Sequence, residues 1–496
     1  MDDRADEVPR WFAPFSRLVP LLVPIGVAVV LLLIPLHVIK LGFLPSDDAL
    51  RHVAKVVSGK SWQDIIVWRS GIEIDHNAGW HNFLGAIRGV TGWGSDGLVT
   101  FSVVFLCVLQ LLVPLAFLRR AEAWAMALLA ALVVHPHVIY RFCLGRPFVF
   151  VMTALMAILF LWLRHAPTRD RTPPKLVAAT TLLMSLSIYV HGGWYLYWLP
   201  AAGFFLAQRW KQGFAMAGCW LAASLLAGLY TGHPVFFLGQ QFQVLVSCFG
   251  QPVLQRMLVL EFQPFDGAWG FVVLAALVLM VQPSRGPLAA ARNPAFMMAV
   301  ACWAFGFVVR RFWTDWGTPA LLVWLAVEIE AILDARVSRE SINRVIATGV
   351  ACFALYFAAA SDHENRWTGN LTRGYLDADR ADLEGWMPEP GGIVYNDDTR
   401  VFYFTFYRNP TAPWRYILGF EVTFMPAEDL AVLRRIQWNS RTPAAYEPWV
   451  RKMTAADRMI LRQPGTSAPG VPGLEWNYAA NDTWIGRLPR PASATP

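Results

Sequence analysis

Two adjacent carboxylates, Asp47 and Asp48, follow the first long apolar run of the chain, in the stretch LPSDDALRHVAKVVSGKSW. Arg51 and His52 come one helical turn later. A carboxylate that is partly desolvated at a bilayer boundary has a raised pKa, which suits a general base. Ser46 could equally be the N-cap of a helix that begins at Asp47, whose positive end favours early carboxylates. The residues alone leave both roles of the pair open.

A second polar group, Asp75, His76 and His81, lies just ahead of the second apolar run, in IEIDHNAGWHNFLGAI. The two histidines are five residues apart, which is not the i, i+4 spacing of a zinc-binding pair on a helix. One metal ion held by both histidines is therefore the less favoured reading. The group is better interpreted as polar side chains at the membrane interface.

Arginines form a third group, at places where a membrane protein usually avoids them. Arg141 and Arg146 frame RFCLGRP, Arg310 and Arg311 open RRFWTDWGTP, and His191 lies in YVHGGWYLYWLP. Any one of these arginines could simply extend to the interface. The planar guanidinium, however, binds phosphate in a bidentate manner, and arginine at membrane depth is costly unless it is paired. As a set they indicate a site for an anionic lipid headgroup in the outer leaflet.

The composition of the chain indicates the scaffold that must position these groups. Of its 496 residues 56% are hydrophobic and 16% are charged, whereas about a quarter of a soluble chain is charged. Repeated apolar runs of about 20 residues predict a polytopic α-helical membrane protein. The net charge of +7 does not indicate nucleic-acid binding, because Lys and Arg concentrate in short loops. The six cysteines show no C-x-x-C spacing, so we interpret them as small buried hydrophobes.

We predict about eleven membrane spans. They cover residues 18–44, 98–118, 122–140, 147–164, 176–190, 194–208, 213–230, 267–282, 294–309, 313–334 and 343–361. Lys and Arg gather in alternate connections, namely Arg119/Arg120, Arg164–Lys175, Arg209/Lys211, Arg285/Arg292 and Arg336–Arg344. Positive residues in short loops mark the cytoplasmic side. The N-terminus is therefore predicted to be cytoplasmic, and the other connections and the C-terminal segment to be periplasmic, in a bacterial inner membrane.

Two domains are predicted: a membrane domain (residues 1–361) and a soluble periplasmic α/β domain (residues 362–496). The first periplasmic loop (residues 45–97) carries apolar residues at helical spacing in Ala49–Val57 and Trp62–Trp68, which predicts amphipathic helices on the outer leaflet. In the C-terminal domain GGIVYNDD and VFYFTFYRNP alternate like strands. PAEDLAVLRRIQW has acidic residues early and arginines late, which predicts a helix.

Taken together, these motifs resemble the GT-C glycosyltransferases, the polytopic enzymes that use polyprenyl-phosphate-linked sugars. PSDDALRH stands where that superfamily has an acidic motif after its first span, and DHNAGWHNFLGAI where it often has a His-Pro-Pro-type segment. Asn77 and Ala78 replace the two prolines. GRPFVF, HGGWYLYWLP, RRFWTDWGTPALLVWLA and GGIVYNDDTRVFYFTFYRNP also resemble stretches of bacterial members. The resemblance covers nearly the whole chain and implies a GT-C-like fold.

The resemblance also implies an activity, namely inverting transfer of a sugar from a polyprenyl-phosphate donor without a covalent intermediate. Asp47 or Asp48 would accept the proton of the acceptor, or would hold a divalent cation such as Mg²⁺ or Mn²⁺. Of the two we favour Asp47 as the base, because it is nearer the end of the first span. The partners implied are the lipid-linked donor, membrane lipids and an unidentified acceptor. The residues expected to bind substrate are Arg51, His52, Asp75, His76, His81, Arg146, His191, Arg310 and Arg311.

Two other functions are considered. Lipid or glycan transporters and flippases also have many spans, but they usually contain internal repeats and charged residues within spans. No repeat stands out here, and the acidic groups gather at one membrane face. A non-catalytic assembly subunit is the other alternative, because the aromatic VFYFTFY could bind a partner protein. Such a subunit would not require Asp47 and Asp48.

The predicted orientation can be tested by labelling intact cells with a membrane-impermeant thiol reagent. Cysteines introduced at Ser95 and Gly470 are expected to react, because both positions are predicted to be periplasmic. A cysteine at Thr172 is expected not to react, because it lies in a predicted cytoplasmic loop. Labelling at Thr172 from outside would overturn the orientation.

Overall fold

A computed structural model describes residues 12–69, 71, 74–165, 172–248, 260–265, 267, 269–281, 286–371, 376–480 and 482–490. The chain forms two compact units. Unit 1 consists of Met1–Phe43, Ser102–Leu238 and Glu261–Trp367, and unit 2 of Leu44–Phe101, Gly239–Leu260 and Thr368–Pro496. Two of the points at which the chain passes from one unit to the other lie within helices, namely α5 (Ser95–Leu112) and α12 (Pro234–Cys248).

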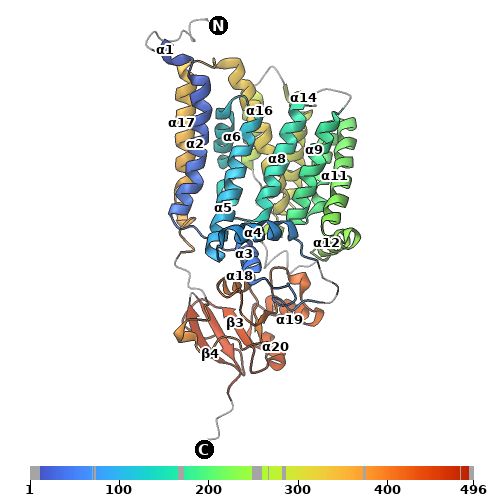
Figure 1. The fold of residues 1–496 in the computed structure, drawn as a ribbon, viewed down its shortest axis with the longest axis vertical. Helices are drawn as coiled ribbons and strands as arrows, with labels where there is room; N and C mark the ends of the chain where they lie inside the picture. Colours follow the sequence, from blue (N-terminus) through green and yellow to red (C-terminus); the bar gives the residue numbers. More distant parts are fainter. Residues whose placement is uncertain are drawn as a thin grey trace, which may run out of the picture. The chain divides into compact units, whose positions relative to one another are not determined.

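Unit 1 is helical, and its long helices run alongside one another (Figure 1). Its helices are α1 (Ala13–Ser16), α2 (Val19–Lys40), α6 (Ala121–Val134), α7 (Val138–Phe142), α8 (Pro147–His165), α9 (Pro174–His191), α10 (Trp198–Leu206), α11 (Trp210–Tyr230), α13 (Trp269–Val281), α14 (Gly286–Ala291), α15 (Pro294–Gly306), α16 (Thr318–Arg336) and α17 (Ile342–Ala360). A π-helical turn, Phe312–Gly317, leads directly into α16.

A helix covers most of each predicted span. In the described part of the chain, six helical segments are long and apolar enough to cross a membrane, and α6, α13 and α15 are shorter apolar helices. The six segments are Val19–Lys40, Ser95–Phe117, Pro147–His165, Trp210–Tyr230, Phe312–Arg336 and Ile342–Ala360. This confirms the predicted class of a multi-pass helical membrane protein.

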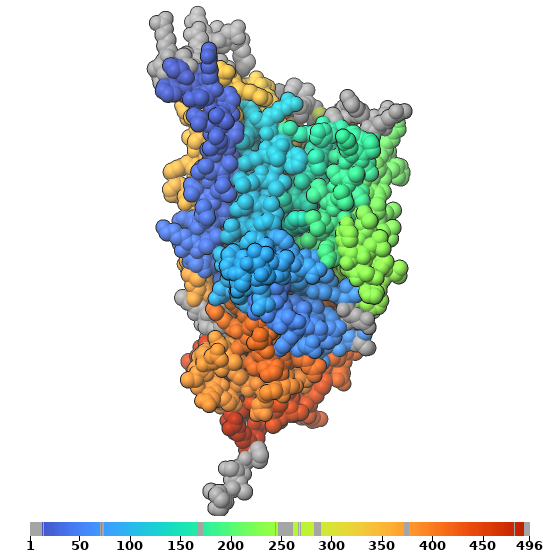
Figure 2. Space-filling view, viewed as in Figure 1, coloured from blue at the N-terminus to red at the C-terminus, as the bar shows by residue number. Residues whose placement is uncertain are grey.

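Helix α2 has the surface expected of a membrane span. It buries a stripe that includes Val27 and Leu31, while Leu21, Leu22 and Leu36 on its outer side are more than half exposed. The space-filling view shows α2 as a dark blue ridge on the surface (Figure 2). Such exposed leucines would be unfavourable in water, but hydrocarbon solvates them.

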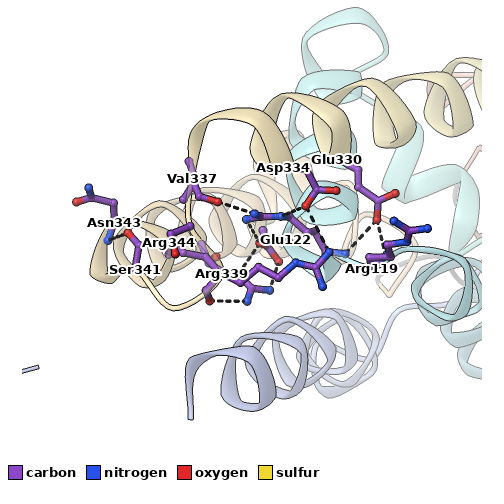
Figure 3. A network of polar contacts seen from close by, with 12 residues as sticks. Arg119, Glu122, Glu330, Asp334, Val337, Arg339, Ser341, Asn343 and Arg344 are labelled. Carbon is purple, nitrogen blue, oxygen red and sulfur yellow. Dashed lines mark hydrogen bonds and ion pairs between the residues drawn. The ribbon is translucent and has the colours of Figure 1, made fainter. Parts of the chain in front are cut away.

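Two of the connections that the sequence groups on one side, Arg119/Arg120 and Arg336–Arg344, lie together at one end of the helices of unit 1. An ion network joins the N-terminal ends of α6 and α17 to the C-terminal end of α16 (Figure 3). Arg344 donates two hydrogen bonds to Glu122, at 2.6 and 3.0 Å, and Arg120 donates one to Asp334 at 2.7 Å. The side chains of Arg344, Arg120 and Glu122 are at most 3% exposed. Because these charges lie away from water, they depend on one another.

Unit 2 combines two helices of the first loop with the C-terminal domain. The first-loop helices are α3 (Asp48–Ser58) and α4 (Ala78–Thr91). The C-terminal elements are β1 (Ile393–Tyr395), α18 (Thr399–Arg408), β2 (Arg415–Tyr416), α19 (Ala427–Trp438), α20 (Glu447–Lys452), β3 (Arg458–Arg462), β4 (Glu475–Ala480) and β5 (Thr483–Arg487). The strands form one sheet in the order β2-β1-β3-β5-β4, in which β2, β1 and β3 are parallel and β3, β5 and β4 are antiparallel. The predicted α/β domain is therefore confirmed.

The segment VFYFTFYRNP was predicted to be a strand, and this was wrong, because it forms most of helix α18. Asp398 is the N-cap of this helix, and its side chain accepts the backbone N–H of Arg400 at 2.9 Å. Buried residues recur at helical spacing, at Val401, Phe402, Thr405 and Phe406. The N-cap and the sheet beneath thus outweigh the strand preference of aromatic residues. The strand in GGIVYNDD and the helix in PAEDLAVLRRIQW are confirmed as β1 and α19.

The first loop packs into the core of unit 2. Its predicted helix Ala49–Val57 is confirmed within α3, but Trp62–Trp68 is not helical. Ile66 instead forms a parallel bridge to Tyr416 on β2, and the backbone N–H of Val67 donates to the Tyr416 carbonyl at 2.9 Å. The first loop and the C-terminal domain therefore belong to one compact unit. The sequence had instead suggested a domain boundary after residue 361, with the first loop in the membrane domain.

The buried ion network makes a testable contribution to stability. Replacing Glu122 by Gln would leave Arg344 and Arg120 without their shared counter-charge, and breaking a buried pair in this way costs about 3–5 kcal/mol. The double change Glu122→Leu and Arg344→Met is expected to cost less, because it removes both charges. Denaturant unfolding of the purified protein in detergent measures the difference.

A matched control is the exposed pair of Glu447 and Arg451, whose side chains are 56% and 75% exposed. Glu447→Gln should change the free energy of unfolding much less, because exposed pairs are screened by water. Equal effects of the two Glu→Gln changes would contradict the role of burial in this network.

Candidate functional site

Helix α3 positions the acidic pair of the first loop. The helix begins at Asp48, so Asp47 is its N-cap residue, and the predicted start at Asp47 after a Ser46 cap was wrong by one residue. The Asp47 side chain makes no capping hydrogen bond to the helix, although aspartate is among the best capping residues. One of its carboxylate oxygens is buried. Side-chain capping is therefore not what Asp47 does here.

Asp48 is held in an ion pair. Its carboxylate accepts a hydrogen bond from Arg51 Nε at 2.8 Å, one turn along the same helix. Arg51 is 7% exposed, and its guanidinium carbon lies 3.9 Å from the centre of the Phe420 ring. The attraction between a cation and the face of an aromatic ring is stronger where water is excluded. The geometry therefore orients Asp48 through Arg51.

A chain of hydrogen bonds links three other predicted residues. His52 Nδ1 lies 2.8 Å from His81 Nε2, and His81 Nδ1 lies 2.5 Å from a carboxylate oxygen of Asp75. His52 comes from α3, His81 from α4, and Asp75 from the loop before α4. His52 is 1% exposed and His81 8% exposed. The fold thus brings together residues that lie up to 29 positions apart in the sequence.

The charge state of Asp75 fixes its hydrogen bond with His81. Burial favours its neutral form, but the charge and hydrogen bond of His81 and the backbone N–H of Asn77 hold the pKa of Asp75 below its ordinary value. An ionised Asp75 accepts the Nδ1–H of His81, and Nε2 of His81 faces Nδ1 of His52. Nε2 of His52 is the ring nitrogen that lies outside this chain. The three side chains can therefore orient an imidazole base and relay a proton.

His76 belongs to a different contact. Its Nε2 lies 2.7 Å from the amide nitrogen of Gln240, which also donates to the Ile74 carbonyl at 2.9 Å. Burial lowers the pKa of His76 to about 4; the charge of Asp75 opposes this and that of Arg51 adds to it. His76 is thus neutral near pH 7, and Gln240 is its partner. In the described ranges, no group of three or more His, Cys, Asp or Glu side chains could hold a metal ion, so the cation considered for Asp47 and Asp48 stays a prediction.

Unit 1 carries the second candidate cluster, built from arginines and two carboxylates. Glu261, in the short 3₁₀ turn Leu260–Phe262, accepts hydrogen bonds from Arg141 at 3.2 and 3.3 Å and from Arg146 at 2.7 Å. Arg141 lies on α7, and Arg146 immediately precedes α8. Two guanidinium groups therefore converge on one carboxylate.

Asp315 anchors the same cluster from the π-helical turn before α16. It is fully buried, and it accepts hydrogen bonds from Arg141, from Arg311 Nε at 2.9 Å and from the Thr314 hydroxyl at 3.0 Å. π-Helical turns are frequent at functional sites. The aromatic face of Phe148 lies 5.4 Å from the Arg311 guanidinium carbon, which adds a cation–π contact.

Of the remaining predicted residues of unit 1, His191 lies beside this cluster. His191 Nε2 is 3.5 Å from Arg311 Nη2, and its ring meets Phe148 edge to face. Arg310 donates its backbone N–H to the Gln263 carbonyl at 2.8 Å. The structure therefore brings together Arg146, Arg311 and His191.

Two members of the cluster, Glu261 and Asp315, were not predicted. Asp315 is four residues after Arg311 within the quoted RRFWTDWGTP motif, so helical spacing could have indicated it. Glu261 is 115 residues from Arg146 and 120 from Arg141. No local signal in the sequence points to such a distant contact.

Comparison with known proteins supports the fold. No protein-family model matches the chain, and no curated protein matches its sequence. The crystal structure of ArnT from Cupriavidus metallidurans bound to undecaprenyl phosphate is similar over 94% of this chain and 97% of ArnT, with 13% identity and a TM-score of 0.54. The apo structure of ArnT has the same coverage and identity and a TM-score of 0.57. The archaeal oligosaccharyltransferase AglB from Archaeoglobus fulgidus, in complex with an inhibitory peptide and a dolichol-phosphate, covers 88% of this chain and 69% of its own, with 11% identity and a TM-score of 0.48.

The similarity to ArnT extends over almost the whole of both chains, which defines the class of fold. The chain has the fold of the GT-C glycosyltransferases, as the sequence motifs indicated. A fold shared at this level of identity does not specify an activity, which has to be argued from the two clusters.

Proposed function

We propose that the protein is an inverting glycosyltransferase of the bacterial inner membrane. It moves a sugar from a polyprenyl-phosphate donor to a periplasmic acceptor, with its N-terminus in the cytoplasm and its C-terminal domain in the periplasm. The observation that carries the proposal is the convergence of Arg141, Arg146 and Arg311 among the helices of a membrane protein. Guanidinium groups gathered in this way are suited to a lipid-linked phosphate.

In the proposed reaction, the arginines bind the phosphate of the donor. As the bond between the anomeric carbon and the phosphate oxygen breaks, the leaving polyprenyl phosphate takes the electron pair and its charge increases. Fixed positive groups stabilise such developing charge without having to reorganise. The arginines are already held by Glu261 and Asp315, so their positions are set before the donor binds.

The acceptor hydroxyl attacks the anomeric carbon from the opposite face, and its proton passes to a carboxylate of the first loop. We assign this base to Asp47, because its side chain is not used for capping and one of its oxygens is buried. Asp48 supports it by fixing Arg51 at the start of α3. The Asp75–His81–His52 chain lies on the same first-loop elements, and it offers a further place for the proton.

The transporter alternative receives less support from the charges of unit 1. The buried pair Glu122–Arg344 and the pair of buried Arg120 with exposed Asp334 lie at helix ends and connect neighbouring helices. That arrangement is typical of structural ion pairs rather than of charges along a transport path. The assembly-subunit alternative differs from the enzyme in needing neither Asp47 nor Asp48, and the aspartate variants described below separate the two.

The first prediction concerns the donor site. Alanine in place of Arg146, Arg310 or Arg311 removes a charge-assisted hydrogen bond worth about 1.5–3 kcal/mol. Donor affinity should therefore fall roughly tenfold to a hundredfold. Binding of a polyprenyl-phosphate donor to each purified variant measures the loss. Arg451→Ala is a control, because the Arg451 side chain is 75% exposed in the C-terminal domain and should leave donor affinity unchanged. Unaltered affinity in all three site variants would refute phosphate binding by these arginines.

The second prediction concerns the acidic pair. Asparagine caps a helix about as well as aspartate, but it cannot accept a proton. Asp47→Asn should therefore keep the thermal stability of the protein while losing about a hundredfold to ten-thousandfold in transfer rate. Asp48→Asn should lose less, because the amide oxygen can still accept from Arg51. Sugar transfer from a polyprenyl-phosphate donor is measured for variants of matched stability.

A role of the pair in holding a cation would give a different pattern, in which changing the divalent ion partly rescues the activity. If both asparagine variants are stable and fully active, the aspartates are not catalytic. The proposed transfer mechanism would then lack its base.

A further inference from the structure

Glu261 differs from an ordinary ion-pair partner in how its arginines surround it. Arg141 Nη1 and Nη2 and Arg146 Nη1 all donate to the same oxygen, Oε1, at 3.3, 3.2 and 2.7 Å. Arginine N–H groups bind phosphate oxygens through the same kind of charge-assisted hydrogen bond. The side chains of Glu261, Arg146 and Arg141 are 20%, 19% and 14% exposed, so an entering ligand can reach all three.

Asp315 holds its arginines in a different way. It is fully buried, and its two oxygens are divided between Arg311 on one side and Arg141 and Thr314 on the other. It also lies within the π-helical turn that continues into α16. Removing a carboxylate so placed would take a counter-charge from both Arg141 and Arg311. Asp315 is therefore a fixed anchor, whereas Glu261 is accessible and reaches the arginines from a turn of three residues.

The charges of the cluster are unequal. Among the ion pairs of the described residues, three guanidinium groups, from Arg141, Arg146 and Arg311, face two carboxylates, from Glu261 and Asp315, which leaves one positive charge. If Glu261 withdraws, two positive charges remain. A phosphate monoester carries about −1.5 to −2 at pH 7. The cluster without Glu261 thus matches the charge of the polyprenyl phosphate that leaves in the transfer reaction.

We propose that Glu261 is a placeholder for the phosphate: its carboxylate occupies the position between Arg141 and Arg146 when the site holds no lipid, and the lipid phosphate displaces it. This proposal rests on the proposed function, because it assigns the same arginines to the donor phosphate. The placeholder supplies a shared counter-charge to two partly buried guanidinium groups, whose mutual repulsion would otherwise be costly. It also competes with the ligand.

The competition has a consequence for turnover. The donor phosphodiester carries less charge than the monoester that leaves, so it displaces Glu261 less completely. As the anomeric bond breaks, the phosphate gains charge and its contacts with the arginines strengthen. An interaction that strengthens in this way favours the transition state over the bound substrate. The return of Glu261 then helps to expel the lipid phosphate product.

Glu261→Gln tests the placeholder directly. The variant keeps the shape of the side chain but removes the charge that competes with phosphate. If Glu261 occupies the site in about nine of ten molecules, its loss should tighten the binding of undecaprenyl phosphate about tenfold. Binding is measured by titration of the purified full-length protein in detergent, with the thermal stability of each variant recorded. Glu261→Asp is a second variant that keeps the charge but is one methylene shorter, and it should tighten binding to a smaller extent.

Asp315→Asn is the matched control. It removes one negative charge from the same cluster, so a simple increase in net positive charge would tighten binding in both variants. A placeholder predicts tighter binding only for Glu261→Gln, with unchanged or weaker binding for Asp315→Asn. Inorganic phosphate provides a second probe, and its affinity should rise in the same direction. Tighter binding of inorganic phosphate with no change for the lipid would overturn the assignment of a lipid ligand.

Two failures can be told apart. If undecaprenyl phosphate binds the unaltered protein and Arg146→Ala weakens that binding, but Glu261→Gln leaves it unchanged or weakens it, only the placeholder is refuted. If the lipid does not bind the unaltered protein, or if Arg146→Ala has no effect on its binding, the donor site fails as well.

Discussion

The need to pair every guanidinium group that leaves water shapes unit 1 of this protein. Hydrocarbon provides no counter-charge, so arginines near the spans are tolerated only with carboxylate or carbonyl partners. Arg344 with Glu122, Arg120 with Asp334, and Arg311 with Asp315 all follow this rule. Each pair joins different helices or the two ends of one turn. The pairing thus fixes how α6, α7, α8, α16 and α17 meet at their ends, while apolar packing holds their middles.

Ion pairs between arginine and carboxylate side chains serve two different roles within unit 1. The Glu122, Arg344 and Arg120 side chains are almost fully buried, and Arg344 binds Glu122 in a bidentate manner. These charged groups are therefore poorly accessible to a ligand. The cluster around Glu261 is partly open and carries one more positive than negative charge. An open cluster with excess positive charge attracts anions. The distinction between a structural ion pair and a candidate phosphate site therefore rests on exposure and balance of charge, and not on residue type.

Much of the fold could be predicted from the sequence because apolar length and the positions of Lys and Arg are local properties. A helix covers most of each predicted span, and β1 and α19 lie where the turn residues and the helix-dipole pattern placed them. The errors fall in unit 2, at Trp62–Trp68 and in α18. There the aromatic pattern does not distinguish strand from helix, and the outcome depends on the N-cap Asp398 and on the bridge between Ile66 and Tyr416.

The sequence by itself determined which residues could do chemistry: the carboxylate pair, the histidines and the arginines, each recognisable from its type and its position beside an apolar run. Tertiary structure alone decided their partners. Glu261 meets Arg146 across 115 residues, and His52 meets His81 across 29. The physical reason is that charge pairing and hydrogen bonding act over a few ångströms in space, whereas sequence patterns report only on neighbours along the chain. The Asp75–His81–His52 chain and the sharing of Glu261 between two arginines therefore emerge only once the helices have packed.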